Sequence, residues 1–156
     1  NFQRNQILTV LQSLDMKDDD CVMLSDVDEL PDRNSVMNVR HHVRRLQVIT
    51  FRQRWFTWNF ELEDPQEWPG TQVMLWSDFK KTTPQKIRNG RYNVGVVSNE
   101  VRGWHLSWFG DNNSVHEKLK SFAHQEIGVK LTFDRDISVA KFCNQHQKQT
   151  CNYCQS

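Results

Sequence analysis

The fold is decided by residues 21–31, which read CVMLSDVDELP. The first four residues form a continuous apolar run, which is typical of a short buried strand. The run ends in a polar turn that carries Asp26 and Asp28, and Pro31 should stop any regular element there. Open α/β sheets bind ligands in the crevice at the carboxyl ends of their strands. The stretch therefore predicts a buried strand that delivers two carboxylates to a site at its end.

On both sides of this stretch the sequence alternates between helical and strand-like patterns. Apolar spacing predicts a helix over residues 2–14, and Asp32 is placed to cap a second helix over 33–46. Aromatic and β-branched residues predict strand over 47–62, whereas the prolines and glycine of 64–70 predict a loop. The other expected elements are a strand at 71–76, a partly helical segment at 77–88 interrupted by Pro84, a turn at Asn89-Gly90, strand-like segments at 94–97 and 103–109, and helices at 111–125 and 135–146. This order predicts the α/β class.

The composition argues against several classes of protein. The chain has 156 residues, the length of one domain or part of one. Lysine and arginine total 20 against 19 for aspartate and glutamate, so the net charge is +1. That balance argues against a nucleic-acid binder and against a polybasic membrane-surface protein. The apolar runs are far shorter than the ~20 residues of a membrane span, so no membrane segment is expected in this chain.

The Asp26-x-Asp28 pair is the sharpest functional signal in the sequence. Two carboxylates spaced in this way at a strand end can lie near one ligand. Mg²⁺ and Mn²⁺ take oxygen ligands, and a metal held by few carboxylates keeps open positions that a diphosphate can fill. The alternative interpretation is a solvated acidic turn that caps the following helix. The apolar strand before the pair and Glu29-x-Pro31 after it favour the metal site.

Three ordered blocks of the sequence resemble glycosyltransferase family 17. Residues 24–31, LSDVDELP, resemble the DxDE(I/L)P signature of the family. Residues 103–108, GWHLSW, are similar to its GWHxS(W/Y) block, and residues 118–126, KLKSFAHQE, to its K(I/L)xSFxHxE stretch. Weaker similarity extends to Arg4-Asn5 and to residues 68–71, WPGT. The resemblance covers about residues 2–146.

The resemblance implies a glycosyltransferase with the two-faced nucleotide-sugar fold called GT-A. It implies a catalytic domain over residues 1–146, without the N-terminal strands that precede the Arg4-Asn5 position in the family, and a cysteine-containing tail over 147–156. The implied donor is UDP-GlcNAc, the acceptor is a glycan, and the cofactor is Mn²⁺ or Mg²⁺. The resemblance does not decide the cellular compartment. An animal-type member is expected in the Golgi lumen, and a microbial or viral member in the cytoplasm.

By the same resemblance, the acidic turn holds the metal on the donor diphosphate. Asp28 is expected to be the direct ligand, and Asp26 to bind the metal through water or to contact the ribose. Glu29 is expected to contact the donor or to brace the turn through backbone N–H groups. Arg4 is a candidate phosphate contact, because a guanidinium matches phosphate oxygens, and the alternative is a solvated helix charge.

An inverting transfer needs a general base near the acceptor hydroxyl. The candidates are Asp111, His105, His124 and Glu126. Asp111 precedes a predicted helix, so a plain helix cap is its alternative role. His124 is also a candidate metal or phosphate contact, and its alternative is a histidine that caps a helix C-terminus.

Trp104 and Trp108 are candidate sugar-stacking residues, with His105 supplying a polar contact. The two tryptophans lie four positions apart, so both should point to the same face of a strand. Their apolar ring faces suit the C–H surface of a sugar. The alternative is that both are core aromatics.

The C-terminal tail carries a second metal hypothesis. Cys143-x-x-His146 and Cys151-x-x-Cys154 offer four soft ligands at zinc-like spacings. A disulfide or free thiols are the alternatives.

Two other classes of function remain open. A phosphatase of the haloacid dehalogenase type also places DxD after an apolar strand, with the first Asp as nucleophile, although Leu30-Pro31 departs from that pattern. The other class is a non-catalytic, glycan-binding fragment, since the N-terminal strands expected of the family are missing.

Overall fold

One five-stranded sheet forms the centre of the computed structural model, which describes residues 2–92, 96–110, 114, 117 and 118. The order of strands across the sheet is β1-β4-β3-β5-β2, and every neighbouring pair is antiparallel except β3 with β5, which is parallel. The strands are β1 (Cys21–Leu24), β2 (Glu29–Pro31), β3 (Ile49–Thr57), β4 (Glu63–Leu75) and β5 (Val96–Ser107).

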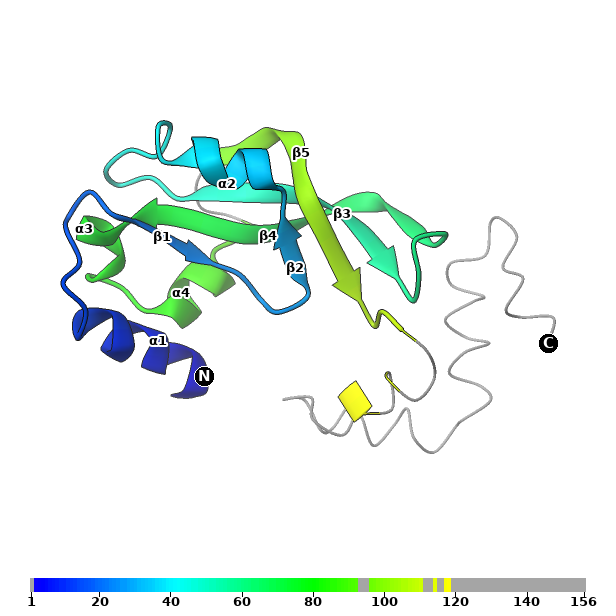
Figure 1. Cartoon of the computed structure of the whole chain (residues 1–156), viewed down its shortest axis with the longest axis horizontal. Coiled ribbons are helices and arrows are strands. Elements are labelled where there is room, and N and C mark those ends of the chain that lie inside the picture. Colours follow the sequence, from blue (N-terminus) through cyan, green and yellow to red (C-terminus); the bar gives the residue numbers. More distant parts are fainter. Residues whose placement is uncertain (1, 93–95, 111–113, 115–116, 119–156) are drawn as a thin grey trace. The chain divides into compact units, whose positions relative to one another are not determined.

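Helices lie on both faces of this sheet. Figure 1 shows α2 on one face and α1, α3 and α4 on the other. Their bounds are α1 (Phe2–Gln12), α2 (Arg33–Val39), α3 (Trp76–Phe79) and α4 (Pro84–Asn89). The arrangement confirms the predicted α/β class.

Strand β1 divides the core between these two faces. Because side chains alternate along a strand, Val22 and Leu24 point to one face and Cys21 and Met23 to the other. Val22 and Leu24 belong to a buried cluster with side chains of β4, α3 and α4, namely Met74, Trp76, Phe79 and Ile87. Cys21 and Met23 pack against a second cluster, formed by Val39, Phe51 and Val73. The apolar run that predicted this strand is therefore buried from both sides.

The two edges of the sheet are joined by a very short connection. β1 and β2 are the outermost strands, yet only residues 25–28 link them. Four strand spacings of a flat sheet would span ~19 Å. The chain from Leu24 to Glu29 reaches at most ~18 Å when fully extended, and here it is folded back by a 3.0 Å hydrogen bond from Glu29 N to Asp26 O. The sheet therefore curls, and its two edges approach each other at the acidic turn.

The prediction of a loop over residues 64–70 is wrong, since these residues belong to β4. Trp68 and Pro69 pair with Gln53 and Arg52 of β3. The register shifts on β3, between Thr50 and Arg52 and between Gln53 and Trp55, lie in this region. Irregular pairing of this kind tolerates proline, which has no N–H for the ladder, so Pro65 and Pro69 lie within the strand.

Two helix boundaries also differ from the predictions. The helix expected over 33–46 ends at Val39. At the expected end of the helix, Leu46 has a φ of 58°, which is not helical, and its backbone N–H donates to the buried Asp78 carboxylate at 2.6 Å. Pro84 begins α4 instead of interrupting a helix, and the Thr83 side chain accepts the N–H of Lys86 as the cap.

The two strand-like segments expected at 94–97 and 103–109 are one strand, β5, which ends at Ser107. The chain divides into two compact units, residues 1–107 and 108–156. The predicted helix over 135–146 and all of the C-terminal tail lie outside the described residues, as does most of the predicted helix over 111–125. Among the described helices none is long and apolar enough to cross a membrane.

Gly103 tests the packing of β5 against β2. Its φ is 132°, and a Cβ at this position would overlap the Leu30 carbonyl oxygen and come within 2.8 Å of Pro31 Cα. Gly103→Ala is therefore expected to lower the free energy of unfolding by about 2 kcal/mol or more, measured by urea denaturation. The matched control is Gly90→Ala, since Gly90 has an ordinary φ of −82°. Equal stability of the two variants would contradict the close packing at Gly103.

Candidate active site

The acidic turn between β1 and β2 is closed by its own hydrogen bonds. Asp26 N donates to Glu29 Oε2 at 3.0 Å, and Glu29 N donates to Asp26 O at the same distance. Ser25 Oγ donates to Glu29 O at 2.9 Å and lies 2.8 Å from Thr71 Oγ1 of β4. The turn is thus fixed both internally and against the sheet, and Glu29 makes the bracing contact with a backbone N–H that was one of its two expected roles.

Glu29 is the most deeply buried of the acidic residues in the turn. Its side chain is 0% exposed and accepts from Arg88 Nη2 at 2.6 Å and from Trp68 Nε1 at 2.9 Å. Arg91 Nη1 lies 3.6 Å from the same carboxylate oxygen, Oε1. Burial of a carboxylate is unfavourable unless charge and hydrogen bonds compensate it. Here the two arginines and the indole N–H provide that compensation.

Arg88 connects α4 to the turn. Its side chain is 3% exposed, and Nη2 lies 2.6 Å from carboxylate oxygens of both Glu29 and Asp26. Nη1 donates to Gly70 O of β4 at 3.0 Å. Burial alone would lower the pKa of Arg88, but its bonds and attraction to the two carboxylates outweigh burial and raise the pKa. Arg88 is therefore a permanently charged group that ties three segments together.

Asp26 is paired with two arginines. Oδ2 lies 2.6 Å from Arg88 Nη2, and Oδ1 lies 3.2 Å from Nη2 of Arg4 on α1. Partial burial by itself would raise the pKa of the Asp26 carboxyl. Attraction and hydrogen bonding from Arg88, with further attraction from Arg4 and Arg91, outweigh it and lower the pKa. The carboxylate is therefore strongly held in its ionised form.

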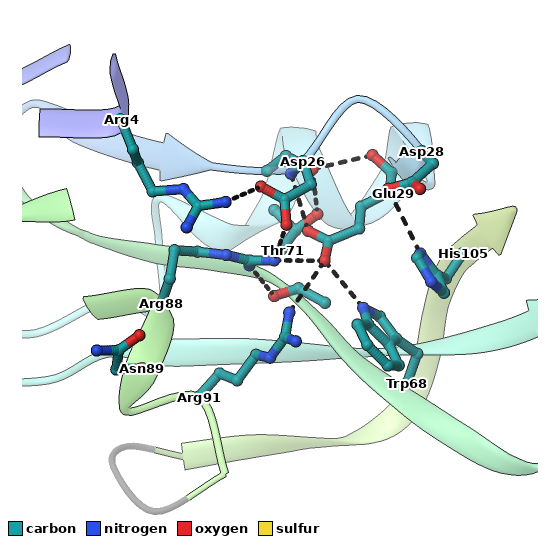
Figure 2. Close-up of polar contacts among 12 residues, drawn as sticks. Arg4, Asp26, Asp28, Glu29, Trp68, Thr71, Arg88, Asn89, Arg91 and His105 are labelled. Atoms are coloured by element: carbon teal, nitrogen blue, oxygen red, sulfur yellow. Dashed lines mark hydrogen bonds and ion pairs between the residues drawn. The ribbon is translucent and has the colours of Figure 1, made fainter. Parts of the chain in front are cut away.

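Asp28 lies on the other side of the turn, facing β5 (Figure 2). Its side chain is 22% exposed, and Oδ1 is 3.7 Å from Nδ1 of the buried His105. The imidazole of His105 stacks on Trp68, with ring centroids 4.3 Å apart and planes 9° from parallel. The Arg91 guanidinium also lies over the Trp68 ring, 4.4 Å from its centroid. Trp68 thus contacts Glu29, His105 and Arg91 and sets their relative positions.

The site fits a divalent metal through Asp28 better than through Asp26. The described part of the chain contains no group of three or more Cys, His, Asp or Glu side chains suited to hold a metal. A metal here would rely on one or two carboxylates, with substrate phosphates and water completing its shell, as Mg²⁺ sites commonly do. Asp28 is partly exposed and suits that role. Both Asp26 oxygens already contact guanidinium groups, whose positive charge repels a cation.

The structure brings together five of the residues predicted from the sequence as site residues. Those five are Arg4, Asp26, Asp28, Glu29 and His105.

The remaining predicted site residues do not join this group. Trp104 is 39% exposed and, by strand alternation, points to the face of β5 opposite to that of His105. Trp108 follows the end of β5 with a φ of 52° and belongs to the second unit, so the two tryptophans do not share a strand face as predicted. Asp111, His124 and Glu126 lie outside the described residues.

Sequence reasoning missed three residues of the site: Trp68, Arg88 and Arg91. Trp68 stood only within a weakly similar block, and the two arginines flank the predicted Asn89-Gly90 turn. Two arginines next to a turn look like solvated charges when nothing indicates the buried carboxylate opposite them. Residues 26–29 contain three acidic side chains, and this was the one signal in the sequence that basic side chains should lie nearby.

Comparison with known proteins identifies a family for this chain. The sequence model described as Glycosyltransferase family 17 matches residues 1–151. No curated protein and no solved structure gives a significant match.

Removing Arg88 should strongly destabilise the fold. Arg88→Leu leaves the buried Glu29 carboxylate without its closest cation, and breaking a buried pair in this way costs about 3–5 kcal/mol. Urea denaturation would measure the loss. The control is Lys80→Met, which removes an exposed partner of Asp18 and should leave stability essentially unchanged. Similar small effects in both variants would show that the Glu29–Arg88 pair does not hold the turn.

The lowered pKa of Asp26 predicts sensitivity to acid. A carboxyl whose pKa is lower in the folded chain stabilises it fully above the unfolded value of ~3.9, and this stabilisation is lost as the pH falls through the folded value. The free energy of unfolding should therefore fall progressively as the pH drops below about 5 and on through the lowered pKa of folded Asp26. In Asp26→Asn the fall should be smaller, as measured by urea denaturation across that range. An identical fall in the variant and the parent would assign the acid sensitivity to other carboxyls.

Proposed function

The chain belongs to glycosyltransferase family 17, and from this premise we propose that the site around its acidic turn binds a nucleotide-sugar donor and passes the sugar to a glycan acceptor. A glycosyltransferase of this kind uses both of these substrates. We further propose that the donor is UDP-GlcNAc, that the sugar transferred is N-acetylglucosamine, and that the complete fold is of the GT-A type. The α/β sheet with helices on both faces is compatible with that fold.

The observation that carries the proposal is the placing of Asp28, His105 and Arg4 around one braced turn. The turn offers a partly exposed carboxylate on one side and a partly exposed guanidinium on the other. A donor of this class carries a diphosphate next to its sugar. The guanidinium can donate hydrogen bonds to its phosphate oxygens. The carboxylate can bind a divalent ion that also binds the same diphosphate.

In this proposal Asp28 holds Mn²⁺ or Mg²⁺ against the diphosphate. The ion would stabilise the negative charge on the departing nucleoside diphosphate. His105, 3.7 Å from Asp28 and fixed by Trp68, orients the carboxylate. Glu29 stabilises the turn from below, because its buried carboxylate accepts a hydrogen bond from the backbone N–H of Asp26.

The group that takes the proton from the acceptor hydroxyl is proposed among His105, Asp111 and Glu126. Only His105 lies in the described part of the chain, and its burial beside Asp28 suits a fixed group at the reacting centre. Trp104 is proposed as an acceptor contact on the exposed face of β5. Trp108 and His124 are proposed as further sugar or phosphate contacts.

The phosphatase alternative has weaker support. It would use Asp26 as a nucleophile, whereas both Asp26 oxygens contact arginines that lower the reactivity of the carboxylate. The family match favours sugar transfer instead.

Calorimetric titration with UDP-GlcNAc tests the proposal. The affinity is expected to be about tenfold higher with Mn²⁺ than with EDTA, and Asp28→Asn should remove that difference while the chain stays folded. The matched control is Asp19→Asn, an exposed aspartate before β1, which should retain the full metal effect. A chain that binds no UDP-GlcNAc in either condition would refute the proposed donor. A metal effect that survives in Asp28→Asn would refute the proposed ligand.

A further inference from the structure

The two carboxylates of the Asp26-x-Asp28 pair have different surroundings. The Asp28 carboxylate faces a histidine, whereas Asp26 has one oxygen on Arg4 and the other on Arg88 (Figure 2). A divalent cation bound directly at Asp26 would stand within a few ångströms of two guanidinium charges. Like charges at such separations repel strongly in a partly buried site. The two aspartates are therefore suited to different tasks.

The two arginines on Asp26 differ in exposure. The Arg88 side chain is 3% exposed and contacts Glu29, Asp26 and the Gly70 carbonyl. The Arg4 side chain is 35% exposed. Arg88 therefore anchors Asp26 from below, and Arg4 is the arginine of this pair that an external anion can reach.

Arg4 is held in place before any ligand arrives. Its Nη2 donates to Asp26 and its Nη1 donates to Gln85 Oε1 at 2.8 Å. Gln85 is itself fixed, because its Nε2 donates to Asn89 Oδ1 at 2.7 Å and its backbone N donates to Asn5 Oδ1 at 3.3 Å. A guanidinium has five N–H donors, so these two bonds leave others for a ligand. A long side chain that is already ordered loses less entropy when it binds.

We propose that Asp26 is a positioning residue that holds Arg4 ready for a phosphate group, and that Asp26 is not a metal ligand. The identity of the anion as the donor diphosphate rests on the proposed function. The arrangement of Arg88, Asp26 and Arg4 itself does not depend on it. The two aspartates thus have different roles. Asp28 binds a cation, whereas Asp26 positions Arg4, which binds an anion.

Two measurements on the whole chain separate these tasks. The first is the affinity for inorganic pyrophosphate, and for UDP-GlcNAc, in EDTA, which reports on Arg4 without any metal. The second is the Mn²⁺ concentration that gives half of the metal-dependent gain in UDP-GlcNAc affinity. A metal ligand changes the second quantity, whereas a residue that acts only through Arg4 changes the first.

Asp26→Asn and Arg4→Ala should each lower the pyrophosphate affinity in EDTA about tenfold, and the double variant should lose no more than either single one. Both single variants should keep the metal-dependent gain and the parent's half-saturating Mn²⁺ concentration, whereas Asp28→Asn should lose the metal-dependent gain. Arg4→Lys should recover only part of the affinity, because an ammonium lacks the planar fork. Arg54→Ala, which removes an exposed arginine paired with Glu63, is the matched control and should bind as the parent does.

Asp26→Glu guards against loss of folding, since it keeps a charge opposite Arg88. It should lower pyrophosphate affinity and leave the half-saturating Mn²⁺ concentration unchanged. A raised Mn²⁺ requirement in either Asp26 variant, or independent losses that add in the double variant, would overturn the proposal. Pyrophosphate binding without UDP-GlcNAc binding would keep the Arg4 site and refute the donor. A parent chain that binds neither would overturn both.

Discussion

The buried pair of Glu29 and Arg88 is the interaction on which the rest of the structure depends. The two side chains, 0% and 3% exposed, meet at 2.6 Å beneath the acidic turn. Neither charge would be tolerated there alone, because moving a single ion out of water costs several kcal/mol. The pair therefore fixes α4 beneath the turn, at the first residue of β2. Asp26 and the Gly70 carbonyl complete the shell around the guanidinium.

Once this pair is in place, the chemistry at the surface follows from it. The turn is held from beneath by Glu29 and from the side by Ser25 and Thr71, so its two aspartates leave the backbone in defined and different directions. Trp68 connects the buried pair to His105. Its indole N–H donates to Glu29, and its ring stacks on His105. The partly exposed groups of the turn are thus supported by buried groups beneath them. Rigid support of this kind is what a transferase needs to keep its donor aligned with an acceptor.

The sequence predicted the strand before the acidic turn well and the long-range contacts poorly. The apolar run of 21–24 and the acids that follow it were enough to predict β1 and the turn after it, because both depend on neighbours in the chain. Residues 64–70 looked like a loop because proline and glycine are poor strand formers, but pairing with β3 overrides that preference. Arg88 and Arg91 could not be recognised, since their partner Glu29 lies far away in the sequence. Trp104 and Trp108 were expected on one strand face, but β5 ends at Ser107, so Trp108 is not part of the strand.

The four-residue link between the two sheet edges also has a consequence for how the chain folds. Among the described strands, β2 pairs only with β5, so residues 29–31 gain a partner strand only once residues 103–105 are available. β1, β3 and β4 can form their antiparallel ladders among residues 21–75 earlier, since those contacts lie closer together in the chain. Contacts between distant residues carry a larger entropy of loop closure and form late. During synthesis, the acidic turn would therefore acquire its final shape only after Ser107 has left the exit tunnel. Among the described strands, the sheet edge that carries the acidic turn is thus the last to be completed.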